Sequence, residues 1–228
     1  MAMGWNCRVK ICGVRTPQAL LDASVAGADA VGLVFAERSP RYIEPGRAAA
    51  LAAQAPPFVD MVGLFTDTPV DEIRAIAAAV PLSTVQLHSE QYDAQAIAEL
   101  APRRVIRALS FDAATAAEHM RTWEEHYREL SNLAGLLVDS PDPSQVGGGT
   151  GVAFDWQALR GLLDDLRPSA PIILAGGLTP ENVSSAIATV RPWAVDVSSG
   201  VESERGVKDS RRIKAFCQAA TGAEPSRG

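Results

Sequence analysis

The feature that most constrains the fold is an unbroken alternation of short apolar runs with longer amphipathic segments rich in alanine and leucine. The short runs are typical of buried strands, and the longer segments are typical of helices that pack one face on a sheet. Strands are expected to end near residue 12 and to cover about 30–35, 59–65, 84–87, 105–109, 135–139, 171–175 and 194–198. Helices are expected at about 16–27, 45–54, 69–79, 93–100, 114–127, 154–163, 180–188 and 209–220.

Eight strands, each followed by a helix, make up the element count of a (β/α)8 barrel in a chain of 228 residues. The strands are apolar along most of their length, as parallel strands covered on both faces are. A doubly wound sheet is the alternative. No linker or shift in composition divides the chain, so we expect one (β/α)8 TIM barrel domain over residues 1–228, with a frayed polar tail from about residue 221. A threonine and a proline are expected to open helices at Thr16-Pro17, Thr68-Pro69 and Thr179-Pro180.

The composition excludes several classes of function. The net charge is −6 and no Lys/Arg cluster occurs, so neither nucleic acid nor an anionic membrane is expected as a partner, whereas a small anionic ligand stays open. The cysteines Cys7, Cys12 and Cys217 are odd in number and lack a C-x-x-C spacing, which indicates neither a disulfide framework nor a zinc site. No stretch is long and apolar enough for a signal peptide or membrane anchor, and we expect a cytoplasmic protein.

In parallel α/β folds the functional groups gather where the strands end, so the residues that follow each strand, its exit, define the expected site. The first strand ends in the run Val9-Lys10-Ile11-Cys12-Gly13. Cys12 can act as a base or nucleophile only as a thiolate, which requires a lowered pKa, and the glycine after it allows a sharp turn and leaves room for a ligand. The alternative is that Cys12 is a small apolar residue of the core.

Three other exits carry polar side chains. Pro40 stiffens the second exit beside Arg41, whose planar guanidinium suits a carboxylate, although an ordinary loop charge is the alternative. His88 ends the fourth strand and is either a site residue or a hydrogen-bonded structural residue. Asp139 ends the apolar sixth strand, where a carboxylate is costly unless it is solvated or used, so it is a site candidate.

Glycines gather at the last three exits, in the runs 147–151, 176–177 and 199–200. Glycine removes side chains where a phosphate can meet backbone N–H groups and a short helix N-terminus, and such sites recur at the seventh and eighth strands of barrels. One such pair would be a turn, but three adjacent exits predict a phosphate cradle. Its expected residues are Gly148, Gly149, Gly176, Gly177, Ser199 and Gly200.

In this order and spacing, the motifs resemble phosphoribosylanthranilate isomerase of tryptophan biosynthesis over nearly the whole chain. They are Lys10-Ile11-Cys12-Gly13, Ser39-Pro40-Arg41, Gln86-Leu87-His88, Leu137-Val138-Asp139-Ser140, Gly148-Gly149-Thr150-Gly151 with Phe154-Asp155-Trp156, Leu174-Ala175-Gly176-Gly177-Leu178, the run 196–202 and Gly206-Val207-Lys208-Asp209. Two positions depart from the family pattern. Ser89 stands where a glycine commonly follows the histidine, and residues 141–146 lengthen the approach to the glycine loop.

The resemblance implies an Amadori rearrangement of N-(5-phospho-β-D-ribosyl)anthranilate, in which the ribose opens to an imine, loses its C2 proton and emerges as 1-(2-carboxyphenylamino)-1-deoxy-D-ribulose 5-phosphate. It implies this small phosphoribosyl substrate, no metal or redox cofactor, and a monomer or homodimer. Asp139 would be the general acid and Cys12 the general base, with the pKa of Asp139 raised and that of Cys12 lowered.

The resemblance also implies binding roles. Arg41 would hold the anthranilate carboxylate, His88 would bind substrate, and the backbone of the last three exits would hold the phosphate. Lys10 shares the strand parity of Cys12 and so points to the same side, where it either helps to hold the thiolate or a carboxylate or forms a buried structural ion pair.

Three rival functions remain. The related phosphoribosyl aminoimidazole-carboxamide isomerase of histidine biosynthesis runs the same rearrangement on a two-phosphate substrate, and it would carry a second glycine-rich cradle and a carboxylate at the first exit, where Cys12 stands. A metal-dependent phosphosugar epimerase needs several His and Asp ligands at strand ends, and only His88 and Asp139 qualify. A non-catalytic phosphosugar-binding barrel would not need Cys12 together with Asp139.

Overall fold

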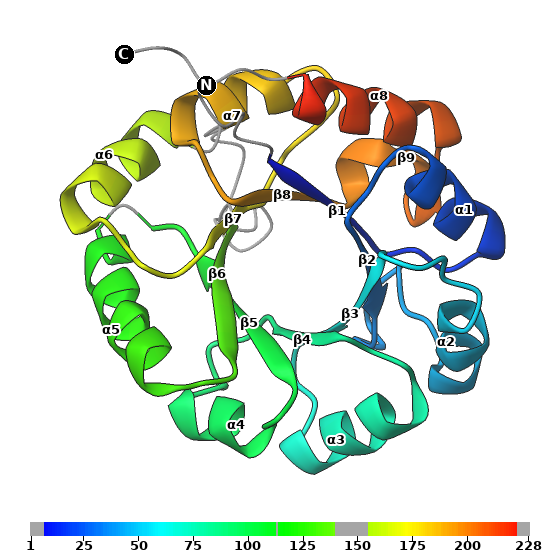
Figure 1. Ribbon diagram of the computed structural model, residues 1–228, viewed down its shortest axis with the longest axis horizontal. Helices are drawn as coiled ribbons and strands as arrows, with labels where there is room; N and C mark the ends of the chain where they lie inside the picture. The colour runs from blue at the N-terminus through cyan, green and yellow to red at the C-terminus, as the bar shows by residue number, and fades with distance from the viewer. Residues whose placement is uncertain (1–6, 113, 140–154, 223–228) are drawn as a thin grey trace.

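The computed structural model describes residues 7–112, 114–139 and 155–222. Eight parallel strands form a closed barrel in sequence order, and the helices lie around it (Figure 1). Pairing of β1 with β8, with Ile11 opposite Val197, closes the sheet and excludes the doubly wound alternative. The strands are β1 (Arg8–Cys12), β2 (Ala30–Val34), β3 (Asp60–Phe65), β4 (Thr84–Leu87), β5 (Arg104–Ser110), β6 (Leu133–Asp139), β7 (Ile172–Leu174) and β8 (Ala194–Val197).

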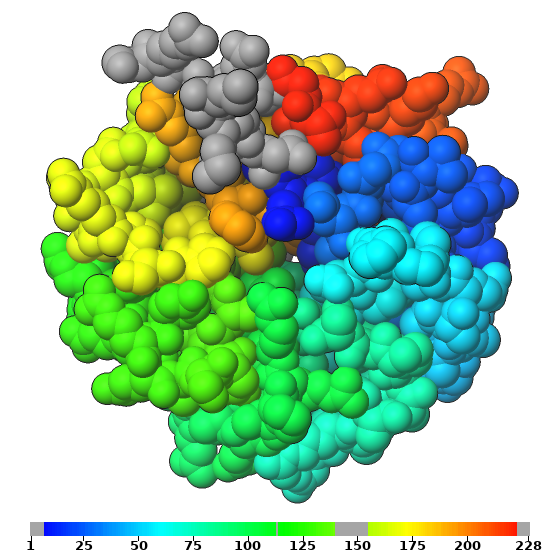
Figure 2. Space-filling model, in the orientation of Figure 1, coloured from blue at the N-terminus to red at the C-terminus, as the bar shows by residue number. Residues whose placement is uncertain are grey.

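One helix follows each strand, as the alternating pattern predicts. These helices are α1 (Pro17–Val25), α2 (Pro45–Ala52), α3 (Val70–Ala79), α4 (Ala94–Glu99), α5 (Ala116–Glu129), α6 (Trp156–Leu166), α7 (Val183–Val190) and α8 (Ser210–Thr221). The colours of Figure 2 pass around the molecule in sequence order, and α8 packs beside α1, so that the last βα unit closes the ring on the first. Among the described residues, no helix combines the length and apolarity that a membrane crossing needs.

Alternate strand residues divide the core into two parts. Outward-facing residues such as Val9 and Ile11 join the large cluster between the barrel and the helices. Inward-facing residues form smaller clusters inside the barrel, one of which contains Cys12, Val34 and Leu64. Because side chains alternate along a strand, Lys10 and Cys12 both point into the barrel, as the parity of the sequence predicts.

Two helix starts differ from the sequence prediction. The Thr16 side chain accepts a hydrogen bond from the Ala19 amide, as expected for the cap of α1. In contrast, α7 begins at Val183 because the amides of Asn182 and Val183 both donate to the Thr179 carbonyl and form a separate turn. Helix α3 is capped at Pro69 without a side-chain hydrogen bond.

The exit of β8 contains structure that the sequence pattern did not predict. A short 3-10 helix η1 (Ser199–Val201) leads into an antiparallel ribbon of β9 (Glu202–Glu204) and β10 (Val207–Lys208), which precedes α8. Gly206 turns this ribbon with a φ of 84°, a left-handed conformation that favours glycine. The predicted frayed tail falls mainly on residues 223–228, which lie outside the described residues.

Candidate active site

The predicted site residues that the structure describes lie at the carboxyl end of the barrel. Cys12 is the last residue of β1 and Asp139 the last residue of β6, while His88 directly follows β4. The barrel therefore brings together side chains from exits far apart in the sequence. Gly148 and Gly149, and the lengthened stretch 141–146, lie outside the described residues.

Cys12 is buried against the neighbouring strand. A Cβ atom on Gly32, its partner on β2, would lie 2.8 Å from the Cys12 Sγ, so this glycine makes room for the thiol. Two residues earlier on β1, the Lys10 Nζ forms an ion pair of 2.9 Å with Asp196 of β8, and both side chains are buried. Lys10 thus forms the buried ion pair that the sequence left as one of its two roles.

Burial raises the pKa of the Cys12 thiol because the thiolate loses water inside the barrel. The ammonium groups of Lys10 and Lys208 lower this pKa, while the Asp196 carboxylate raises it. In this structure the pKa of Cys12 is therefore raised, in contrast to the expected lowering. The physical reason is that Lys10 is already paired with a carboxylate, so its charge only partly offsets the desolvation of the thiolate.

His88 and Asp139 meet across the barrel mouth. The His88 Nε2 lies 3.7 Å from the Asp139 Oδ2, and the side chains are 38% and 27% exposed, respectively. The His88 amide donates to the Phe65 carbonyl at 2.8 Å, which fixes the chain where it leaves β4. A half-exposed imidazole beside the predicted acid fits a site residue better than a closed structural role.

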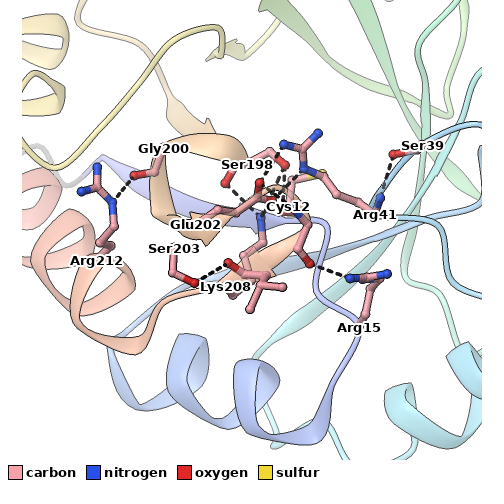
Figure 3. Close-up of polar contacts among 12 residues, drawn as sticks. Cys12, Arg15, Ser39, Arg41, Ser198, Gly200, Glu202, Ser203, Lys208 and Arg212 are labelled. Atoms are coloured by element: carbon pink, nitrogen blue, oxygen red, sulfur yellow. Dashed lines mark hydrogen bonds and ion pairs between the residues drawn. The ribbon is translucent and has the colours of Figure 1, made fainter.

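Arg41 is held by a partner that the sequence reasoning missed. Its Nε and Nη2 atoms donate to the two carboxylate oxygens of Glu202 at 2.7 and 2.9 Å, in a bidentate pair (Figure 3). The aliphatic part of Arg41 packs on Gly13, where a Cβ atom would lie 2.8 Å from the Arg41 Cδ. Arg41 is therefore neither an ordinary loop charge nor an unoccupied fork, because one edge of its guanidinium is already bound.

Glu202 is the centre of a charged cluster at the exits of β1, β2 and β8. It also accepts hydrogen bonds from the Lys208 Nζ at 2.9 Å and from the Gly206 amide at 3.0 Å. Burial alone would raise the pKa of Glu202, but the hydrogen bonds from Arg41, Gly206 and Lys208 lower it to about 2. Glu202 and Lys208 lie within motifs that are visible in the sequence, but only the fold of the β9–β10 ribbon shows which residues they contact.

The exits of β7 and β8 present backbone rather than charged side chains. Gly176 and Gly177 have φ angles of 83° and 63°, and a Cβ atom on Gly177 would meet nothing within 4 Å. A Cβ atom on Gly200 would lie 1.8 Å from the Leu178 carbonyl oxygen, so only glycine lets the two exits pack together. No described residue accepts a hydrogen bond from the amides of Gly177, Ser199 or Gly200.

The site offers proton donors and acceptors but few metal ligands. Among the described residues, no group of three or more His, Cys, Asp or Glu side chains is arranged to hold a metal ion. A hollow of about 400 Å³ between the exits of β2 and β3 is lined by other residues, including Phe35, Arg38 and Thr66. We therefore locate the site from the charged and thiol side chains at the barrel mouth rather than from this hollow.

A closed barrel with a thiol, a carboxylate and glycine-rich exits at one end has the features of a TIM-barrel enzyme that acts on a small phosphorylated molecule. Residues 9–219 match the family model of N-(5'-phosphoribosyl)anthranilate (PRA) isomerase. The chain belongs to this family of isomerases of tryptophan biosynthesis.

Similar proteins cover almost the whole chain. The N-(5'-phosphoribosyl)anthranilate isomerase of Herminiimonas arsenicoxydans is 43% identical over 215 residues, covering 93% of this chain and 92% of that protein. The solved phosphoribosyl anthranilate isomerase from Thermotoga maritima is 40% identical with a TM-score of 0.81, and the match covers 95% and 99% of the two chains. A solved complex of such an enzyme with reduced 1-(o-carboxyphenylamino)-1-deoxyribulose 5-phosphate has a TM-score of 0.79 at 38% identity, with the same coverage.

Proposed function

We propose that the chain converts N-(5-phospho-β-D-ribosyl)anthranilate to 1-(2-carboxyphenylamino)-1-deoxy-D-ribulose 5-phosphate by an Amadori rearrangement, with Asp139 as general acid and Cys12 as general base. The observation that carries this proposal is the position of the two side chains at the carboxyl ends of β6 and β1, within one barrel mouth. Acid and base are then available on different sides of a substrate bound between them.

Asp139 serves the ring-opening step. Its carboxyl proton passes to the ribose ring oxygen as the C1–O bond breaks, and the lone pair of the anthranilate nitrogen forms the protonated imine. The neighbouring His88 imidazole, 3.7 Å away, fits the role of holding this carboxyl in place. The half-open position of Asp139 at the mouth supports contact with a bound sugar.

Cys12 serves the proton-abstraction step. As thiolate it takes the C2 proton, the electrons of the C–H bond move into the imine to form an enolamine, and tautomerisation of this species yields the ketone. Burial raises the pKa of Cys12 and so disfavours the thiolate, whereas the positive charges of Lys10 and Lys208 favour the thiolate. Burial also keeps water away from the carbanion-like centre.

The two ends of the substrate meet different parts of the mouth. Arg41 binds the anthranilate carboxylate with the part of its guanidinium that Glu202 leaves open. The phosphate is bound by backbone amides at Gly176, Gly177, Ser199 and Gly200, where the amides lack described acceptors and the space above Gly177 is open. Gly148 and Gly149 stay predicted members of this cradle.

The direct test is turnover by the purified enzyme. Phosphoribosylanthranilate is fluorescent, so its consumption is followed by loss of fluorescence. The product is an isomer of the substrate and is identified by reduction of its ketone to the stable amino alcohol. A second reaction with the two-phosphate aminoimidazole-carboxamide substrate distinguishes the histidine-pathway alternative. We expect kcat/KM for phosphoribosylanthranilate to be much larger than kcat/KM for the aminoimidazole-carboxamide substrate. An enzyme that does not turn over phosphoribosylanthranilate would contradict the proposal.

The setting of the enzyme follows from the same proposal. The three cysteines are all free thiols and buried, which fits a reducing compartment such as the cytoplasm. We expect a monomer or a homodimer, and a solved relative from Thermotoga maritima is described as a dimeric enzyme. Neither nucleic acid nor membrane is part of the proposal.

A further inference from the structure

We propose that Glu202 and Lys208 are positioning residues for Arg41, which bind one edge of its guanidinium so that the other edge faces the substrate carboxylate. This inference rests on the proposed role of Arg41 in binding the anthranilate group. Neither residue is proposed to touch substrate. Both reach the site through the β9–β10 ribbon, which the sequence pattern did not predict.

The hydrogen bonds divide the guanidinium into a used and an unused edge. Nε and Nη2 of Arg41 both donate to Glu202, whereas no described residue accepts a hydrogen bond from Nη1. The side chain of Arg41 is 21% exposed, compared with 5% for Glu202, so Arg41 is more accessible to a ligand than Glu202 is. A planar guanidinium can bind one carboxylate along each edge, and the edge formed by Nη1 and Nη2 thus remains for a ligand.

Glu202 is held too firmly to move with Arg41. Its Oε1 accepts from Arg41 and Lys208 and its Oε2 accepts from Arg41 and the Gly206 amide, so both oxygens carry two hydrogen bonds. Lys208, whose side chain is 3% exposed, also donates to the Ser198 carbonyl at 2.9 Å. The Ser198 hydroxyl in turn donates to the Cys12 carbonyl at 3.2 Å, which ties the cluster to β1 (Figure 3).

The rest of Arg41 is fixed by the two neighbouring exits. Its amide donates to the Ser39 Oγ at 3.1 Å, and its aliphatic part lies on Gly13. The Gly206 turn packs on the Pro40 carbonyl, where a Cβ atom would lie 2.6 Å from the oxygen. Backbone, aliphatic part and guanidinium are thus held by different loops, which reduces the side-chain entropy that Arg41 would lose on binding a ligand.

The charges of the cluster suit a single carboxylate. Arg41 and Lys208 carry two positive charges and Glu202 one negative charge, so the three side chains together leave one positive charge. Buried ion pairs do not by themselves stabilise a fold better than apolar side chains of the same volume. A bound carboxylate would neutralise the remaining charge at the open edge of Arg41.

The experiment measures how much the carboxylate of a ligand contributes to affinity. The probes are reduced 1-(2-carboxyphenylamino)-1-deoxyribulose 5-phosphate and its analogue without the carboxyl group, and the ratio of their Kd values is determined by calorimetry. In the unmodified enzyme we expect this ratio to favour the carboxylated ligand roughly tenfold or more, as charge-assisted bidentate contacts do. Arg41→Ala should bring the ratio close to one.

Glu202→Gln should lower the ratio several-fold while leaving the Kd of the uncarboxylated ligand unchanged. The matched control is Glu124→Gln, because Glu124 is also a buried carboxylate that accepts from two backbone amides, those of Ser169 and Ala170, and pairs with an arginine, Arg128. Glu124 contacts the segment before β7, at the opposite end of that strand from the site. Glu124→Gln should show the same ratio of Kd values as the unmodified enzyme, even where it lowers the stability of the fold.

Glu202→Gln alone removes the carboxylate partner of Arg41 and of the buried Lys208, so a second variant guards against misfolding. The double variant Glu202→Gln with Lys208→Met removes one charge of each sign and should fold, yet it should also show the reduced ratio. A folded double variant with the unmodified ratio would overturn the positioning role while leaving Arg41 as a carboxylate ligand. A ratio near one in the unmodified enzyme would instead refute the role of Arg41 itself.

Discussion

The two ends of the site are built in different ways. At the exits of β1, β2 and β8, charged side chains from separate loops are bound to one another, with Arg41, Glu202 and Lys208 at their centre. At the exit of β7 and the start of η1, the chain presents backbone amides and left-handed glycines, without a charged side chain in the turn. Recognition by side chains therefore depends on partners from elsewhere in the sequence, whereas recognition by backbone depends mainly on local conformation.

Removal of the proposed base and acid, Cys12 and Asp139, should have the largest effect. Cys12→Ala or Asp139→Asn should lower kcat by roughly 10²-fold or more, since a positioned acid or base contributes about 10² to 10⁴ to the rate. KM should change much less, because both binding ends are left intact. Stopped-flow or steady-state fluorescence with phosphoribosylanthranilate measures both constants.

Cys217→Ala is the control for the loss of a thiol, because Cys217 is buried in α8 among the outer core residues. It should lower stability and leave kcat near its original value. Near-normal turnover by Cys12→Ala would make Cys12 a core residue, and the base would then lie elsewhere.

The pH dependence of the reactivity of Cys12 shows whether burial or the nearby positive charges dominate the pKa of its thiol. Because burial raises the pKa of Cys12 above its usual value of 9.0, we expect the thiolate fraction to rise about tenfold per pH unit below that pKa. Alkylation by iodoacetamide, in a background with Cys7 and Cys217 replaced by serine, should accelerate accordingly without a plateau below pH 9.0. The limb of the kcat/KM profile that reports this thiol should lie in the same range.

A plateau of alkylation near neutrality would show that the two lysines outweigh burial. Protection by the reduced product analogue provides the control, since a thiol in the site should be shielded by a bound ligand. A rate that the analogue does not change would place the reactive thiol outside the site.

The phosphate end should be weakened by a single methyl group. Gly177→Ala places a side chain at a φ of 63°, which costs about 1–2 kcal/mol, and puts the methyl group into the open space where we place the phosphate. We expect KM for the phosphorylated substrate, and the inhibition constant for inorganic phosphate, to rise by roughly tenfold with a smaller change in kcat. Gly161→Ala in α6 is the control, since a Cβ atom there meets nothing within 4 Å and φ is not left-handed; it should leave KM unchanged.

The carboxylate end should respond less strongly to a conservative change. Arg41→Lys keeps the positive charge but loses the planar fork, so Glu202 and a ligand can no longer share one group in bidentate fashion. KM should rise by several-fold, less than for Arg41→Ala, and kcat should change little. Arg38→Lys, an exposed residue of the same loop, should leave both constants unchanged, and an equal effect of the two substitutions would argue against a specific role for Arg41.

The glycines at the exits of β7 and β8 are easier to recognise in the sequence than the partners of Arg41, for a physical reason. The glycines at 176, 177 and 200 are visible in the chain because a left-handed φ or a close packing contact needs glycine at those positions. The pairing of Arg41 with Glu202 joins residues 161 positions apart, and no local spacing indicates it. The same holds for the pKa of Cys12, which depends on the pairing of Lys10 with the distant Asp196.

The alternation of apolar and amphipathic segments by itself determined eight strand–helix units and favoured the barrel over a doubly wound sheet, because strand and helix periodicity are local properties. It also placed Cys12, Arg41, His88 and Asp139 at strand exits. Only the tertiary structure decided which charges neutralise one another, because electrostatic and hydrogen-bond energies depend on distances between exits that closure of the ring sets. For that reason the β9–β10 ribbon and the partners of Arg41 appear only in the folded molecule.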